Sequence, residues 1–327
     1  KNPQKTNTVI YATAAFFLRV LYRCYFLYFI RSNRGKPVFR NIGIVSAVSS
    51  KTIEKAVLEV VSIISEKGCK AYLDNRIVLN SASADMEVLP VSALSEKCDL
   101  IISIGGDGTL LQAATLTYPH EVALLGINLG RLGFLADLPP DNLKADLGAI
   151  LEGDVITEER SVLGCEVVRS EKVIATCHGL NDVVIQKWNS ARLITLNTYV
   201  NNKFLHSQRG DGMIVATPTG STAYAMSGGG PILDPEIDAL ALVPICPHTL
   251  TNRPIVISDK AMIEIRIATE RDDQARLTCD GNSIHDLLRG DKIFISRKAK
   301  AIKLAHPSKN NHYATLRAKL NWALDPC

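Results

Sequence analysis

The stretch from Cys98 to Gln112 restricts the fold of this chain more than any other part of the sequence. An apolar run rich in β-branched residues, 100–104, is followed by Gly-Gly-Asp-Gly-Thr at 105–109 and then by a helical pattern. A buried strand that ends in a glycine turn before a helix is typical of a phosphate site. Glycine lets an anion approach the backbone, and the first helical turn presents free N–H groups. The stretch therefore predicts an α/β unit whose glycine turn contacts phosphate.

Asp107 is the residue of this turn that phosphate binding does not require. A carboxylate beside a polyphosphate is repelled unless it acts through a metal ion or accepts a proton. Asp also caps helices well, so Asp107 could simply cap the helix that follows. Three glycines in four positions are more than a cap needs, which makes Asp107 the first catalytic candidate. The chain has no Walker A sequence, so a P-loop enzyme is excluded.

Two kinds of pattern divide the chain. In residues 41–153, short buried strands alternate with segments of helical periodicity, which is typical of an α/β domain with a mostly parallel sheet. The expected strands are 42–45, 71–73, 100–104 and 122–127, the expected helices are 52–67 (ended by Gly68), 92–97, 109–117 and 141–151, and 80–91 is expected to be a loop. Ligands of such sheets bind at the carboxyl ends of strands, where the glycine turn lies.

The pattern changes near residue 154. From 154 to 303 the apolar runs are short, rich in β-branched residues and separated by turn residues, which predicts a β-dominated domain. The expected strands are 162–168, 173–176, 183–186, 193–200, 213–216, 255–257, 262–268, 275–279 and 292–296. Residues 304–327 form a tail that we expect to be partly helical, from 311 to 323, and to pack on the fold.

Residues 1–40 differ from the rest of the chain. They hold eight basic side chains and no acidic one, and the segment 9–30 is apolar and aromatic. Arg19 and Arg23, near the middle of that segment, would each cost about 2.5–3.5 kcal/mol in a bilayer, so no stable membrane insertion is expected. Three interpretations remain: a peripheral anchor, an artefact of the expressed sequence, or translated upstream sequence that is disordered outside the fold. We favour the last two.

Charge and cysteine content limit the partners and the compartment. The chain has 37 basic and 33 acidic side chains, and without the eight of the extension 29 basic ones remain, a net charge of −4. The basic excess is therefore no argument for nucleic acid as a partner. The eight cysteines are scattered, with no C-x-x-C pair and no histidines at zinc spacing, so we expect reduced thiols in a cytoplasmic protein.

Three further motifs carry polar groups suited to a nucleotide. Asn181-Asp182 places an amide and a carboxylate where a loop enters a strand, although an ordinary Asx turn would have the same sequence. Arg209 and Asp211 could hold a diphosphate and sugar hydroxyls, or they could form a surface ion pair. The run 216–231 is dense in hydroxyls and glycines, which offer many donors at low steric cost. A flexible linker is the alternative for this run, but its aromatic and apolar members favour order.

In this order and spacing, the motifs resemble those of the NAD kinases, of the bacterial type. The resemblance extends from about Asn41 to the C-terminus and rests on 105–109, 126–135, Asn181-Asp182 and 217–231, with 279–282 and 321–322 in their usual late places. The glycine turn alone is shared with diacylglycerol kinases, sphingosine kinases and phosphofructokinases. Asn181-Asp182 and 217–231 narrow the resemblance to NAD kinases.

The resemblance implies a cytoplasmic enzyme that transfers the γ-phosphoryl group of ATP to the 2′-hydroxyl of the adenosine ribose of NAD, with Mg²⁺ or Mn²⁺. It also implies homodimers or homotetramers built through the β-dominated domain. Asp107 would be the proton acceptor. The implied NAD-binding residues are Asp107, Gly108, Asn181, Asp182, Arg192, Arg209, Asp211, Thr222, Ala223, Tyr224, Ala225, Met226, Ser227 and Asn282. The implied ATP- and phosphate-binding residues are Gly105, Gly106, Gly108 and Thr109.

Two positions depart from the family pattern, and two other functions stay open. Asp182 is the shorter accepted variant of the usual Glu, and Asn282 stands where many members have Gln. A lipid kinase would share the glycine turn but phosphorylate diacylglycerol or sphingosine. A catalytically silent regulator would bind NAD without forming NADP, and the intact Asp107 argues against it.

Overall fold

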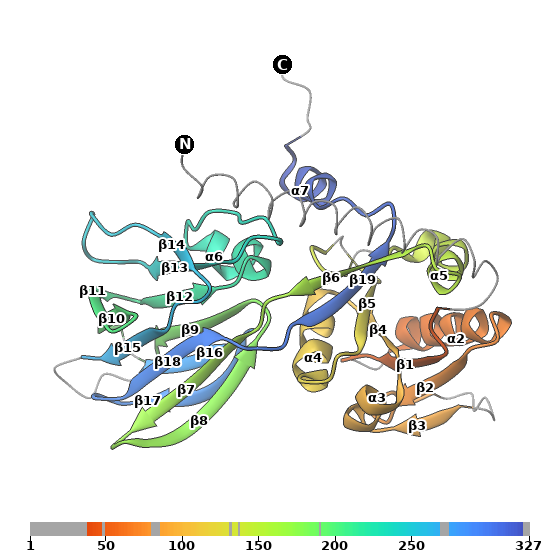
Figure 1. Cartoon of the computed structure of the whole chain (residues 1–327), viewed down its shortest axis with the longest axis horizontal. Coiled ribbons are helices and arrows are strands. Elements are labelled where there is room, and N and C mark those ends of the chain that lie inside the picture. The colour runs from red at the N-terminus through yellow and green to blue at the C-terminus, as the bar shows by residue number, and fades with distance from the viewer. Residues whose placement is uncertain are drawn as a thin grey trace, which may run out of the picture.

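The first domain is built on a seven-stranded sheet (Figure 1). The computed structural model describes residues 38–47, 50–79, 86–130, 133–136, 138–189, 191–268 and 275–322, so the interpretations of the extension concern residues that lie almost wholly outside this description. The strand order is β3 (Glu87–Leu89), β2 (Lys70–Asp74), β1 (Asn41–Val45), β4 (Leu100–Gly105), β5 (Ala123–Asn128), β19 (Ile302–Pro307) and β6 (Val155–Arg160). Neighbouring strands are parallel except β19 and β6, which are antiparallel.

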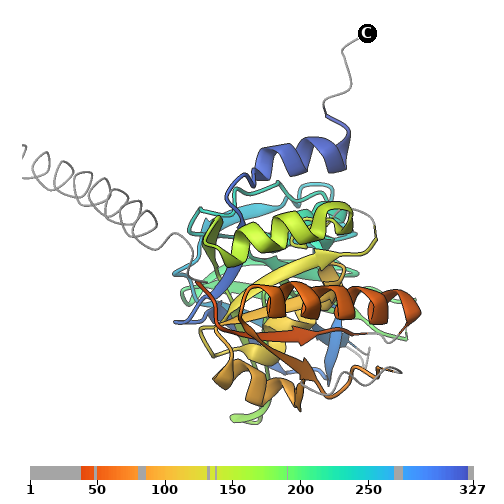
Figure 2. The ribbon, with the colours of Figure 1, turned by 90° about the vertical axis from the view of Figure 1, so that its right-hand side faces the viewer.

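Helices cover both faces of this sheet. Buried side chains of α2 (Lys51–Glu66) and α5 (Leu143–Leu151) pack on one face, where the two helices lie side by side (Figure 2). Those of α3 (Val91–Lys97) and α4 (Asp107–Thr117) pack on the other. Ile102 of β4 belongs to the first cluster and Ile101 to the second, and both are fully buried. A sheet covered on both faces requires continuous apolar strands, which is the pattern of 100–104.

The second domain contains two six-stranded antiparallel sheets, packed face to face around one apolar core. The first has the order β11 (Lys203–Gly210), β10 (Ile194–Val200), β15 (Ile263–Ile267), β18 (Lys292–Arg297), β7 (Leu163–Arg169) and β8 (Lys172–Gly179). The second has the order β14 (Ile255–Ser258), β13 (Ala239–Ile245), β12 (Gly212–Ala216), β9 (Asp182–Lys187), β16 (Ala275–Cys279) and β17 (Asn282–Leu287). The predicted fold class, an α/β domain with a mostly parallel sheet and a β-dominated domain, is therefore confirmed.

Short helical segments cover the outer face of the second sheet. They are η2 (Thr219–Thr222) and α6 (Tyr224–Ser227), and they lie inside the glycine- and hydroxyl-rich run whose order the sequence predicts. Ala225 of α6 packs in one buried cluster with Val184, Ile214 and Val243 of the strands below. The run is thus an ordered cover on the sheet and not a linker.

The sheets divide the chain differently from the predicted boundaries. The division at 153/154 and the tail from 304 would assign β6 to the β-dominated domain and split β19, yet both strands complete the first sheet. The two strands pair with each other along Ile302↔Arg160 to Pro307↔Val155, a partnership between segments too far apart for local patterns to reveal. We therefore propose domain limits of 38–160 with 302–322, and 161–301.

Several elements were not predicted. Strand β3 lies within 80–91, which was expected to be a loop. Strand β13 is buried along its whole length, but its Ala and Pro residues are weak strand formers. Its pairing with β14 ends at Leu242↔Ile255, so Pro244 lies where the strand has only one neighbour, β12. Most of the helices and strands that were predicted occur within two residues of their predicted limits.

The expectation of reduced thiols is wrong for one pair. Cys177 of β8 and Cys279 of β16 form a disulfide between the two sheets, with their Cα atoms 6.7 Å apart. The two residues are 102 positions apart, and only the folded sandwich brings them together. Cys69, Cys98 and Cys165 are free and buried, and Cys246 is free and exposed. Among the described helices, none is long and apolar enough to cross a membrane.

Candidate functional site

Asp107 lies in the glycine turn, and the neighbouring loop 134–136 holds its side chain in a fixed orientation. Strand β4 ends at Gly105 and α4 begins at Asp107. The backbone N–H groups of Phe134, Leu135 and Ala136 donate to the Asp107 carboxylate at 2.7, 3.1 and 2.9 Å. An ionised carboxylate accepts about four hydrogen bonds, so about one position is left for another donor. The alternative that Asp107 is only a helix cap does not account for these contacts, because its carboxylate binds a different loop.

Glycine is required where the loop approaches this carboxylate. A Cβ atom at Gly133 would overlap the Asp107 side chain, and a Cβ at Gly105 would overlap that of Thr109. Gly108 is exposed in the first turn of α4. The phosphate-binding candidates Gly105, Gly106, Gly108 and Thr109 thus surround the start of a helix whose dipole favours an anion.

A second carboxylate organises the Asn181-Asp182 motif. Asp280, at the β16–β17 turn, accepts hydrogen bonds from the N–H groups of Leu180, Asn181 and Asp182 at 2.7, 2.7 and 3.1 Å. Asp107 and Asp280 therefore share one arrangement, in which an Asp carboxylate binds three consecutive backbone N–H groups of a distant loop. Burial raises the pKa of Asp280, and the three N–H groups oppose that effect.

The run after β12 holds the same loop from its other side. The Thr217 N–H donates to the carbonyl of Asn181 at 2.9 Å, and the Thr217 hydroxyl donates to the carbonyl of Leu180 at 2.6 Å. A Cβ at Gly220 would overlap the Asn181 backbone, so only glycine fits there. The Asn181 side-chain oxygen is buried and has no hydrogen-bond partner within the described residues. An unsatisfied buried acceptor of this kind is costly unless a ligand supplies a donor.

A pocket of about 310 Å³ opens between α6 and the outer face of the second sheet. Its lining residues are Asp182, Val184, Gln186, Ala223, Tyr224, Thr278, Asp280 and Gly281. Burial, together with the negative charge of Asp280, raises the pKa of Asp182 to about 7. Perturbed carboxyl groups in a pocket are typical of functional sites.

The structure brings only some of the predicted NAD-binding residues to this pocket. Asp182, Ala223 and Tyr224 line it, and Thr222, Ala225, Met226 and Ser227 belong to the segments that cover it. Arg192 and Arg209 are exposed, Arg209 within β11, and Asp211 pairs with Lys187 at 2.8 Å. These last three residues are not among those that line the pocket.

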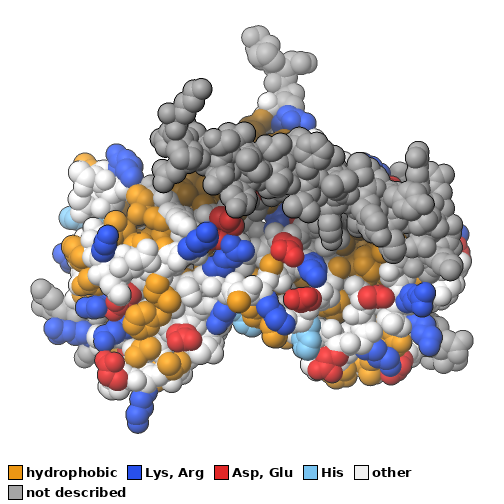
Figure 3. All heavy atoms as spheres, viewed as in Figure 1, with side chains coloured by type: hydrophobic (Ala, Val, Ile, Leu, Met, Phe, Trp, Pro, Cys, Tyr) orange, Lys and Arg blue, Asp and Glu red, His pale blue; other side chains and the backbone are white. Residues whose placement is uncertain are grey.

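Asn282 lies at a different cavity. A pocket of about 360 Å³ separates α4 from β8 and β17, and Asn282 lines it together with Gln112 of α4 and the Cys177–Cys279 disulfide. His178 of β8 donates to the carbonyl of Thr115 of α4 at 3.0 Å, so the two domains meet beside this cavity. The surface in Figure 3 is hollowed between the two domains.

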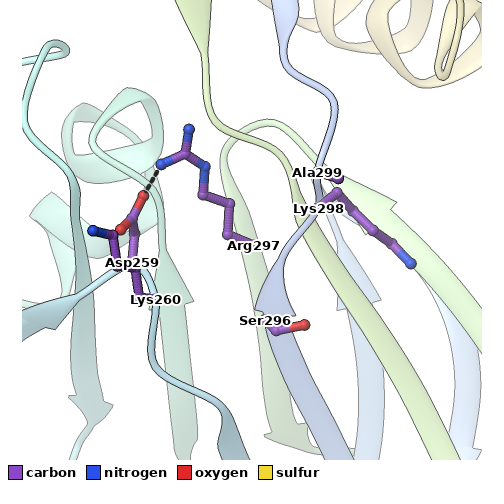
Figure 4. A pocket seen from close by; sticks show the side chains of 6 residues that line it. All are labelled: Asp259, Lys260, Ser296, Arg297, Lys298 and Ala299. Atoms are coloured by element: carbon purple, nitrogen blue, oxygen red, sulfur yellow. Dashed lines mark hydrogen bonds and ion pairs between the residues drawn. The ribbon is translucent and has the colours of Figure 1, made fainter.

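A third pocket, of about 360 Å³, is lined by more charged side chains than the other two (Figure 4). It lies where the chain crosses from β18 to β19, and its lining residues are Asp259, Lys260, Ser296, Arg297, Lys298 and Ala299. Arg297 pairs with Asp259 and also with Asp238. The Lys298 side chain points away from this pair in Figure 4. The cations therefore do not converge on one point, and the pocket does not resemble an anion site.

Sequence reasoning missed several residues of the site. Asp280, Thr217 and Gly220 lie inside the motifs 279–282 and 217–231, but only the fold shows that they act on Asn181 and Leu180. No cluster of three or more metal-ligating side chains occurs in the described part of the chain. A magnesium-bound nucleotide needs few protein ligands, because the phosphates and water supply most of them.

Fold and site together are those of a two-domain nucleotide-binding protein, with a glycine turn at the start of a helix in one domain and a carboxyl-lined pocket in the other. Comparison with known proteins names the group. Residues 42–155 match the ATP-NAD kinase N-terminal domain, and residues 180–306 match the ATP-NAD kinase C-terminal domain. The chain belongs to the NAD kinase family.

Curated relatives and solved structures agree. An NAD kinase of Nitrosococcus oceani is 41% identical over 288 residues, 88% of this chain and 98% of that protein. An NAD kinase of Teredinibacter turnerae is 39% identical over 285 residues, 87% of this chain and 97% of that protein. The fold resembles that of yeast NADH kinase complexed with NADH, at a TM-score of 0.79 and 24% identity over 89% of this chain and 90% of that chain. It also resembles an NAD kinase from Archaeoglobus fulgidus in complex with ATP, at a TM-score of 0.69 and 24% identity over 86% of this chain and 98% of that chain.

Proposed function

We propose that this protein transfers the γ-phosphoryl group of ATP to the 2′-hydroxyl of the adenosine ribose of NAD, forming NADP and ADP, with Asp107 as the general base. The observation that carries this proposal is the fixed Asp107 carboxylate, three of whose acceptor positions are occupied by the N–H groups of 134–136. A carboxylate so held, at the start of a helix behind a glycine turn, combines a proton acceptor with a phosphate site in one segment.

The proposed step needs only positioning and charge. The 2′-hydroxyl donates a hydrogen bond to Asp107, its proton passes to the carboxylate as the oxygen attacks the γ-phosphorus, and the bond to the β,γ-bridging oxygen breaks. The glycine turn and the first N–H groups of α4 stabilise the charge that develops on the phosphoryl oxygens.

A divalent metal, Mg²⁺ or Mn²⁺, belongs to the proposal as a companion of ATP. Bound to the phosphates, it would neutralise charge on the transferred group. Its ligands would be phosphate oxygens and water, because the one acceptor position left on the Asp107 carboxylate is used by the 2′-hydroxyl in the proposed step.

The NAD site of the proposal is the 310 Å³ pocket with the loop beside it. The buried side-chain oxygen of Asn181, which has no partner within the described residues, and the Asp182 carboxyl would receive ribose and adenine donors. Tyr224 and the rest of the 222–227 segment would cover them. Arg192, Arg209, Asp211 and Asn282 stay in the proposed site as more distant contacts.

Oligomerisation and location are also proposals. The edge strands β11 and β14 expose apolar side chains, including Phe204 at 59% and Val256 at 46%, which supports a homodimer or homotetramer through the second domain. Acidic and basic side chains alternate over the face seen in Figure 3, which gives no support to nucleic acid as a partner. Light scattering of the purified protein tests the first point, and cell fractionation tests the cytoplasmic location.

One coupled assay tests the function. Purified protein is incubated with ATP or another phosphoryl donor, Mg²⁺, and NAD or NADH, and NADP is measured with an NADP-specific dehydrogenase. Formation of NADP from NAD and ATP is expected. Tight NAD binding without NADP would indicate the silent regulator, and transfer of labelled phosphate to diacylglycerol or sphingosine instead would indicate a lipid kinase.

A further inference from the structure

The C-terminal helix α7 (His312–Leu320) has little apolar packing of its own. Leu316 is its single buried residue. The Asn311 side chain caps its start by accepting from the N–H groups of Tyr313 and Ala314, and Asn321 ends it in a left-handed conformation. A helix with one buried side chain is held mainly by specific contacts at its ends, and α7 lies above the junction of the two domains (Figure 1).

The first end of α7 contacts the second domain. The Tyr313 hydroxyl donates to the Asp234 carboxylate at 2.6 Å, and this hydrogen bond, with one from the Glu236 N–H, lowers the pKa of Asp234. The neighbouring Leu233 N–H donates to the Ser221 hydroxyl at 2.9 Å. Ser221 belongs to η2, so this end of α7 is linked to the cover of the nucleotide pocket.

The other end of α7 contacts the first domain beside Asp107, the proposed general base. The Lys319 ammonium lies over the Phe134 ring, 5.1 Å from its centroid, within cation–π range. The Phe134 N–H in turn donates to the Asp107 carboxylate at 2.7 Å. Within the described residues no carboxylate pairs with Lys319, so the aromatic ring is its observed partner.

We propose that α7 is a clasp across the two domains and that Lys319 is a positioning residue for the reaction. Lys319 fixes the Phe134 ring, the ring fixes the backbone of 134–136, and these N–H groups aim the Asp107 carboxylate. Tyr313 holds the same helix to the loop at Asp234, so the base and the nucleotide pocket keep one relative position. The inference rests on the proposed function, since it concerns the efficiency of that reaction.

The test compares three variants on the full-length protein. Lys319→Ala removes the cation, Lys319→Arg keeps it, and Arg317→Ala is the matched control, an exposed cation on the same helix without a side-chain contact to Phe134. A misplaced catalytic group costs about 10- to 100-fold in rate. We therefore expect Lys319→Ala to lower kcat by about 10-fold while KM for NAD and for ATP stay within about twofold, with Lys319→Arg close to wild type.

A double-mutant cycle tests whether Lys319 acts on Asp107 through the Phe134 ring. If Lys319 acts through the ring, Phe134→Leu and Lys319→Ala lower kcat by similar factors and the double variant is no worse than either. If the two losses in kcat are instead additive in the double variant, Lys319 does not act through Phe134. A rise in KM for ATP with unchanged kcat would show that the ammonium binds the donor itself, which overturns the positioning role. Equal losses in Arg317→Ala would do the same.

The wild-type measurement separates the two proposals. A wild-type protein that forms no NADP contradicts the proposed function. An active wild type whose Lys319→Ala variant keeps full kcat contradicts the clasp alone. Thermal unfolding of each variant is recorded in parallel, and a drop in kcat at unchanged Tm is the expected combination.

Discussion

The Asp280 carboxylate accepts a hydrogen bond from the Asn181 N–H at 2.7 Å, across 99 positions of sequence. The same carboxylate accepts from the N–H groups of Leu180 and Asp182, so the backbone at the start of β9 is held in a single conformation. Asp107 does the same for the loop 134–136 in the other domain. The two halves of the candidate site are thus each fixed by an Asp that binds three consecutive backbone N–H groups.

Asp280→Asn is predicted to weaken NAD binding. The side-chain NH₂ of the new Asn would face the loop N–H groups, which are donors too, so at least one hydrogen bond to the loop is lost. A hydrogen bond to a charged acceptor contributes about 1.5–3 kcal/mol. About 1.4 kcal/mol corresponds to tenfold in affinity, so Kd for NAD should rise about 10- to 100-fold. Equilibrium titration with NAD measures it. Asp286→Asn, at an exposed carboxylate paired with Arg276 on the next strand, is the control and should leave Kd within about twofold.

Asp107→Asn is predicted to lower kcat by about 10²- to 10⁴-fold, the usual contribution of a general base. The three N–H groups at 134–136 also face the new amide, so the loop is disturbed, while NAD binding at the separate pocket should be kept. Turnover and NAD titration are measured on the same sample. The matched control is Asp99→Asn, because Asp99 likewise accepts from two backbone N–H groups, of Arg40 and Asn41, away from the site. Near-normal turnover in Asp107→Asn would remove the base assignment.

The sequence predicted those elements whose structure depends on residues close to them in the chain. The α2 helix was predicted because Ile53, Val57, Val60 and Ile64 recur at helical spacing, and the glycine turn because it breaks a buried strand. In both cases the interactions that decide the structure lie within a few residues. The same holds for α7, whose cap at Asn311 lies beside its first turn.

Distant partners were not predictable in the same way. Strand β6 pairs with β19, the hydrogen bonds of Asp280 go to residues about 100 positions away, and Cys279 meets Cys177 across the sandwich. Each feature depends on a neighbour that only the complete fold supplies. Asp107 and Asp182 are candidates that the sequence alone indicates, whereas the residues that hold them in place are visible only in the contacts of the fold.

Thiol chemistry is predicted to distinguish the cysteines. The chain has eight, and the Cys177–Cys279 disulfide leaves at most six thiols in the denatured, unreduced protein. In the native protein at pH 8, exposed Cys246 should react first among the free cysteines that the structure describes, since burial raises the pKa of Cys98 and of Cys165 to about 12. Alkylation with peptide mapping, before and after a dithiol reductant, measures both. Eight thiols without reductant would show that the pair is reduced, as the sequence interpretation expected.

The pH dependence of stability and of NAD binding is predicted to depend on Asp182. Its pKa is raised from the ordinary 3.8 to about 7 by burial and by the charge of Asp280, so the folded state favours the protonated form. The folded protein therefore binds more protons than the unfolded chain between about pH 4 and 7, and the contribution to stability is complete below pH 4 and lost as pH rises through 7.

The ionised form is the one suited to ribose hydroxyls, since a carboxylate accepts from both oxygens. KM for NAD should therefore rise as pH falls below about 7, and the free energy of unfolding should rise as well, because the fold favours the protonated form while the ligand favours the ionised one. Denaturant unfolding and initial rates between pH 5 and 8.5 measure both, each as the difference between wild type and Asp182→Asn, so that other titrating groups cancel. A difference that does not vary with pH would contradict the raised pKa, because the amide side chain of the Asp182→Asn variant has no proton to lose in this range.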